Sequence, residues 1–115
     1  MKSLYKEPSK TSKQVFLDIL KENITVNVCQ ATVDAVHSIR DYDWLLVQLS
    51  KLLEHEDGQV RGVTATCIGH LARLCPKKAD REQLLSTLSP HLSDESIIGQ
   101  VEDAIDDIDI FLKNN

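Results

Sequence analysis

The 115-residue sequence has few glycines, prolines and aromatic residues, and it contains no long apolar run. No stretch approaches the ~20 consecutive apolar residues that a membrane-spanning helix needs, and none follows residues 1–10 that could form the core of a secretory signal. Gly-rich phosphate loops and basic-aromatic nucleic-acid motifs are also absent. The formal net charge of -5 argues against general nucleic-acid binding, which requires a basic surface. We therefore expect a cytoplasmic protein that binds neither membranes nor nucleic acid.

The three cysteines are odd in number and lie inside helical patterns, where free cysteine usually behaves as a small buried residue. Cys67, His70 and Cys75 are close in sequence, but structural zinc normally takes four ligands. A fourth would require the chain to fold back to His37 or His91. A thiol nucleophile on the same residues has no identifiable carboxylate to orient its base. We expect neither a metal nor another cofactor.

Apolar residues recur at spacings of three and four along most of the chain, which predicts an all-α protein with one domain, residues 1–115. The expected helices cover about residues 12–21, 27–39, 43–53, 59–74, 80–88 and 94–113. Thr11 or Ser12 should cap the first helix and Asp43 the third, because their side-chain oxygens can accept hydrogen bonds from free backbone N–H groups. Pro90 indicates a break or kink before the last helix. Residues 1–11 are expected to form a flexible segment.

A repeated pattern groups these helices into three pairs, at about residues 12–40, 43–75 and 78–113. The second helix of the middle pair has the inward positions Val60, Thr64, Cys67, Ile68 and Leu71. A shift back by 32 residues places there Val28, Thr32, Ala35, Val36 and Ile39. A shift forward by 37 residues places there Ile97, Val101, Ala104, Ile105 and Ile108. One pair alone cannot bury its apolar face, so we expect the pairs to stack around one continuous core.

The middle pair resembles a HEAT repeat. After Asp57 it reads V-R-x-x-T-x-x-C-I-G-x-L, which is similar to that family's V-R-x-x-A-x-x-A-L-G-x-L pattern, with Thr64 and Cys67 in place of two alanines. The first and third pairs depart from the pattern, as terminal repeats do because one face of each meets water. The resemblance implies a short right-handed solenoid of three antiparallel helix pairs, with the second helices lining a concave protein-binding face.

Charge is distributed unevenly along the chain. Residues 82–112 contain eight acidic residues and no Lys or Arg. On the last helix Asp103, Asp106 and Asp107, here called the acidic ridge, lie opposite the apolar stripe and repel one another. The repeat alignment places them in a column that also contains Thr66, Gly69 and His70 of the middle pair, Asp34, His37 and Ser38 of the first, and Arg73 one turn further on. This column is either a binding surface for a basic protein or an ordinary solvated face.

Tyr42 and Trp44 flank Asp43 in the turn between the first and second pairs, and Trp44 is the only tryptophan. Aromatic side chains dominate the energetics of protein interfaces. A lone tryptophan in a small domain is equally often an anchor of the core. Tyr42 and Trp44 are therefore either interface residues or anchors of the core.

The combination of size, acidity and repeat pattern resembles small bacterial HEAT-like immunity proteins and antitoxins. That resemblance implies a non-catalytic protein, monomeric when free, that binds and neutralises a basic toxin domain such as a nuclease. The acidic ridge, Asp34, His37, His70, Arg73, Tyr42 and Trp44 would contact this partner. One alternative is a HEAT adaptor or assembly subunit for a different protein. Another is a HEAT-type enzyme subunit, either a cofactor lyase or a metal hydroxylase, for which His55 and Glu56 provide only half of a ligand set.

Overall fold

The computed structural model describes residues 7–113, and within that range all regular structure is helical. The helices are α1 (Lys13–Glu22), α2 (Thr25–Ser38), α3 (Tyr42–Leu52), α4 (Gly58–Leu74), α5 (Arg81–Leu88), the 3-10 helix η1 (Ser89–Ser93) and α6 (Ile98–Phe111). The all-α prediction is therefore confirmed. The predicted flexible segment falls partly on residues 1–6, which lie outside the described residues.

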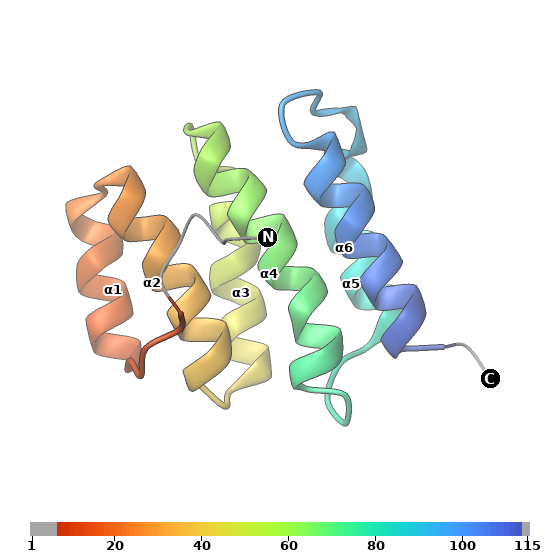
Figure 1. Ribbon diagram of the computed structural model, residues 1–115, viewed down its shortest axis with the longest axis horizontal. Helices are drawn as coiled ribbons and strands as arrows, with labels where there is room; N and C mark the ends of the chain where they lie inside the picture. Colours follow the sequence, from red (N-terminus) through yellow and green to blue (C-terminus); the bar gives the residue numbers. More distant parts are fainter. Residues whose placement is uncertain (1–6, 114–115) are drawn as a thin grey trace.

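Short turns join α1 to α2 and α3 to α4, a longer connection that contains η1 joins α5 to α6, and each pair is antiparallel (Figure 1). The three pairs lie side by side, with α2, α4 and α6 in one layer, α3 and α5 behind it, and α1 beside α2 at one edge (Figure 1). Helix α4 packs closely against both α2 and α6, whereas within residues 7–113 the backbones of the first helices of neighbouring pairs lie further apart. The second helices consequently form the tighter layer of the stack.

The repeat alignment correctly identifies the core. All five inward positions of α4, from Val60 to Leu71, are buried, and so are their five counterparts at α2. On the third pair Ile105 is only half-buried, while the other four aligned residues are buried. Thr32 and Thr64 are buried without loss of hydrogen bonding, because each hydroxyl donates to the carbonyl oxygen four residues earlier at 2.7 Å.

Two predicted helix starts are wrong. Asp41, not Asp43, caps α3, because the Asp41 carboxylate accepts a hydrogen bond from the Trp44 N–H. Helix α6 begins at Ile98 and not near residue 94, since η1 and a turn occupy the residues after Pro90. Ser12 caps α1, as expected.

Hydrogen bonds between equivalent turns join the pairs at one end of the stack. The Thr25 hydroxyl donates to Asp57 at 2.7 Å, and Arg61 Nε donates to Asp94 at 3.0 Å. The Thr25 bond and a backbone N–H lower the pKa of the Asp57 carboxyl; bonds from Ser96 and from Arg61 lower that of Asp94. These bonds fix the register between successive pairs.

Both ring nitrogens of His55 take part in this network. Nε2 lies 2.6 Å from Asn23 Oδ1, and Nδ1 accepts a hydrogen bond from the Asp57 N–H. His55 therefore joins the first two pairs. Among residues 7–113, no group of three or more His, Cys, Asp and Glu side chains is placed to hold a metal ion. In the same range, every helix is too short or too polar to cross a membrane.

Candidate protein-binding surface

A close crossing of α4 and α6 aligns their exposed faces. A Cβ atom on Gly69 would lie only 2.8 Å from the Cα of Ala104, so the backbone of α6 occupies the space that any other side chain would need. Two turns earlier along α4, a Cβ on Gly62 would lie 3.1 Å from the side-chain amide of Gln100. Glycine at these two positions lets the helices approach closely, which brings residues beside the crossing into one column.

The central part of the predicted column is assembled at this crossing. The rings of His37 and His70 meet edge to face with centroids 6.0 Å apart. Burial lowers the pKa of the half-buried His70, as do Arg73 and His37, whereas Asp107 acts in the opposite direction. His70 Nδ1 is buried and has no hydrogen-bond partner within residues 7–113. The structure thus places His37, His70 and Asp107, from three successive pairs, in electrostatic contact.

The other two members of the acidic ridge lie further out. Asp103 and Asp106 are exposed and, together with Glu102, border a shallow depression of about 530 Å³ whose apolar part is formed by Leu92 and Ile105. In the described chain none of these three carboxylates forms an ion pair. Nearby Asp109 differs, since Arg81 binds it at 2.7 Å. The depression is therefore negative and unneutralised.

The polar side chains of the α2 part of the column already form hydrogen bonds within the protein. Asp34 Oδ1 accepts hydrogen bonds from the Ser9 N–H at 2.9 Å and from Gln30 at 3.0 Å. The Ser38 hydroxyl donates to the Ser9 carbonyl and accepts from the Thr11 N–H. Residues 9–11 consequently lie against α2 and cover this end of the column. Sequence reasoning missed this contact, because no periodic pattern marks it.

Tyr42 is buried, and Trp44 is half-buried and packs against the core. Tyr42 is 4% exposed, and its hydroxyl lies 3.0 Å from Gln83 Oε1 in α5. Trp44 meets Phe16 of α1 edge to face at 5.9 Å, with the Lys13 ammonium 5.1 Å from the indole ring. These contacts join α3 to α5 and to α1, so in the free protein both aromatics are structural anchors.

The cysteines and His70 do not converge. Burial raises the pKa of the Cys67 thiol to about 12, and the nearby Cys29 adds to the shift. The thiols of Cys29 and Cys67 lie in the core, whereas Cys75 is half-buried and lines a cavity at the surface. Burial also raises the pKa of Cys75, against the opposing effect of Arg40.

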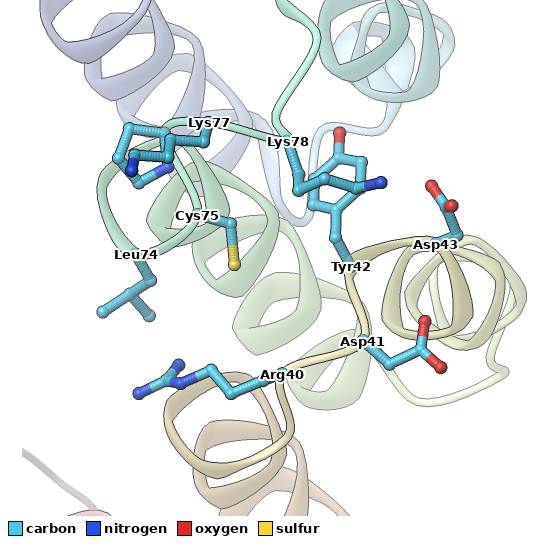
Figure 2. Close-up of a pocket in the computed structure, with 9 residues that line it drawn as sticks. Arg40, Asp41, Tyr42, Asp43, Leu74, Cys75, Lys77 and Lys78 are labelled. Atoms are coloured by element: carbon cyan, nitrogen blue, oxygen red, sulfur yellow. The ribbon is translucent and has the colours of Figure 1, made fainter.

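That cavity, which the sequence did not indicate, lies where the α2–α3 turn meets the α4–α5 turn (Figure 2). Its volume is about 520 Å³. We call it the turn pocket; its lining residues are Arg40, Asp41, Tyr42, Asp43, Leu74, Cys75, Pro76, Lys77 and Lys78.

No protein-family model and no curated protein matches the sequence. The fold is similar to a chain in the crystal structure of the CDI complex from Cupriavidus taiwanensis LMG 19424, with a TM-score of 0.83 and 22% sequence identity. The match covers 96% of this chain and 98% of that one. At this identity the likeness establishes a shared fold over nearly the full length of both chains. Membership of the HEAT family stays a prediction.

Proposed function

We propose that this chain is a non-catalytic immunity protein that binds and neutralises a basic toxin domain, such as a nuclease. The observation that carries the proposal is the set of three exposed carboxylates on α6, those of Glu102, Asp103 and Asp106, which form no ion pair within residues 7–113. A chain of the same fold is part of a CDI complex, which supports a role in binding another component.

The acidic ridge would act by taking the place of nucleic-acid phosphates. A nuclease needs a positive groove to bind its substrate, and Asp103, Asp106 and Asp107 project from a helix held rigidly against α4. Their field would speed the encounter with such a groove, while the contacts formed on docking would set the lifetime of the complex. Occlusion of the groove requires no chemistry by the inhibitor.

The test replaces Asp103, Asp106 and Asp107 by asparagine. The candidate partner is the protein encoded by the adjacent open reading frame, titrated with the parent and the variant at low and moderate salt. If one of these aspartates forms a desolvated ion pair, the variant should lose at least ~1–2 kcal/mol of affinity. The variant should also associate more slowly, and its association rate should depend less on salt concentration. Its thermal stability should stay equal or rise slightly.

A charge-matched control replaces Asp18, Glu22 and Glu56 by their amides. These three side chains are exposed on α1 and on the α3–α4 turn, away from the acidic ridge, and their removal changes the net charge equally. The control should keep most of the affinity. Equal affinities and equal salt slopes for the parent and the ridge variant would refute the proposed mode of binding.

A further inference from the structure

The turn pocket concentrates positive charge in an acidic protein. Arg40 comes from the α2–α3 turn, and Lys77 and Lys78 come from the α4–α5 turn (Figure 2). Within residues 7–113 none of the three forms an ion pair. Of the two carboxylates in the lining, Asp41 is bound by Lys13 at 2.7 Å. Asp41 also attracts Lys78, and Asp43 is the second carboxylate, so the lining has one more cation than it has carboxylates.

One side of the pocket is partly apolar and is fixed by hydrogen bonds. Tyr42 forms one wall, and its hydroxyl is held by Gln83 and by the Asp80 N–H. Leu74 and Cys75 border the same space, with the Cys75 sulfur directed between Leu74 and Arg40 (Figure 2). The apolar side of the pocket leaves less water to screen the attraction between the cations and an anion that enters.

The turn pocket lies next to one end of the column. Arg73, the last predicted member, directly precedes the lining residue Leu74 in α4. His37 lies near the end of α2, from which the chain enters the turn that carries Arg40. A protein bound along the column would therefore reach the pocket at the ends of these two helices.

We propose that the turn pocket binds acidic side chains, Asp or Glu, from an extended segment of the partner protein. The identity of the partner rests on the proposed function, but the preference for carboxylates rests on the pocket alone. Arg40 offers a planar guanidinium for a carboxylate, and the two lysines add point charges. A nucleic-acid backbone fits less well, because Asp43 and the net charge of -5 repel a continuous polyanion.

With this pocket, recognition depends on charges of both signs. The ridge on α6 favours a basic surface, while the pocket near the ends of α2 and α4 requires an acidic one. A partner with only a basic groove would leave the pocket unfilled, and an evenly acidic protein would be repelled by the ridge. Opposite signs at two separate points fix the orientation of the partner and reject proteins that match only one of them.

Cys75 provides a direct probe of occupancy without any toxin. Cys29 and Cys67 are each 1% exposed, so in the folded protein the half-buried Cys75 is the thiol that reagents reach. The uncharged disulfide 4,4′-dithiodipyridine forms a mixed disulfide with the thiolate and releases absorbing thiopyridone. A blocked hexaglutamate peptide should slow this reaction by about tenfold when its free concentration is about ten times its Kd, because the bound peptide covers the sulfur.

Variants distinguish the pocket from general charge effects. Replacing Arg40, Lys77 and Lys78 by glutamine should abolish the protection by hexaglutamate. Replacing the exposed Lys10, Lys21 and Lys51 by glutamine should preserve the protection, although both triple variants lose three positive charges. Circular dichroism verifies folding, and the single Lys77→Gln variant, expected to show partial loss, replaces the triple variant if helicity falls.

Three results would overturn the proposal. The first is no protection of the parent by hexaglutamate, and the second is equal protection of the parent and the pocket variant. The third is stronger protection by a hexathymidylate oligonucleotide, which would identify the pocket as a nucleic-acid phosphate site. Blocked hexalysine should give no protection. Because no toxin enters this assay, its outcome is independent of the ridge experiment, and either idea can fail alone.

Discussion

The two flanks of α4 are built differently. Toward α6 the flank is made of small residues, and Gly69 leaves no room for a Cβ beside Ala104. Toward α2 the space is filled by larger groups, including the edge-to-face rings of His37 and His70. Helix α6 is thus held by close approach of its backbone to α4, and α2 is held by side-chain packing. The close flank determines where the acidic ridge lies relative to α4.

The same comparison extends to the open side of α6. The small residues Gly62, Ala65, Gly69 and Ala72, shifted by 37, correspond to Gly99, Glu102, Asp106 and Asp109. A Cβ on Gly99 would meet nothing within 4 Å, whereas one on Gly69 would collide with α6. Where α4 carries small residues to receive the next helix, α6 carries acids that prevent another helix from stacking. Glu102 and Asp106 therefore also serve as an end cap, a role that requires no partner.

The largest expected effect tests the core that both flanks share. Leu71 is fully buried in α4, so Leu71→Ala should destabilise the protein by about 2–5 kcal/mol. That is a large part of the total stability of a domain of this size. The exposed Glu102→Ala should change stability by no more than about 0.5 kcal/mol. Urea unfolding followed by circular dichroism gives both values, and equal midpoints would contradict the assigned burial.

A smaller effect separates the close flank from the open one. Gly69→Ala should destabilise by about 1–3 kcal/mol, because the new methyl group pushes α6 away from α4. Gly99→Ala makes the same chemical change where space is open, and it should stabilise by up to about 1 kcal/mol through helix propensity. Thermal unfolding of the two variants measures the difference. If both glycines respond alike, the close crossing is wrong.

The sequence predicted the core far better than the surface. Burial at Val60, Thr64 and Leu71 follows from helical periodicity, and the repeat alignment transferred it correctly to α2. The same alignment placed His37, His70 and Asp107 in one column, because equivalent positions in stacked pairs face the same side. Each of these predictions depends only on spacing within a helix and on stacking of similar units.

The errors arose where contacts link distant or irregular segments. Asp41 and Asp43 are equally good caps by composition, and the choice between them depends on the backbone of the preceding turn. The bonds from Ser9 to Asp34 and Ser38 join residues that no periodicity relates. The turn pocket unites residues from two turns that lie more than 30 residues apart, and no pattern in the sequence relates them. Such features can be predicted only when the positions of the helix pairs in space are known.

The smallest expected effect is a pH dependence at the column between the two flanks. Burial holds the pKa of His70 below its ordinary value of 6.5, with Arg73 and His37 adding to the shift against Asp107. The unfolded chain therefore takes up this proton more readily than the folded protein. Stability contributed by neutral His70 is complete above about pH 6.5 and is lost as the pH falls through the folded pKa.

Urea midpoints measured from about pH 8 to about pH 5 should therefore fall more for the parent than for His70→Gln, because glutamine cannot take up the proton. Asp107→Asn should deepen the fall, since it removes the carboxylate that favours charged His70. The lowered pKa values of Asp41, Asp57 and Asp94 do not interfere, because their contribution is lost only below their ordinary value of 3.8. An NMR titration of the His70 ring protons gives the folded pKa directly. A pKa at or above 6.5, or identical pH profiles for the parent and His70→Gln, would show that His70 is not desolvated between α2 and α6.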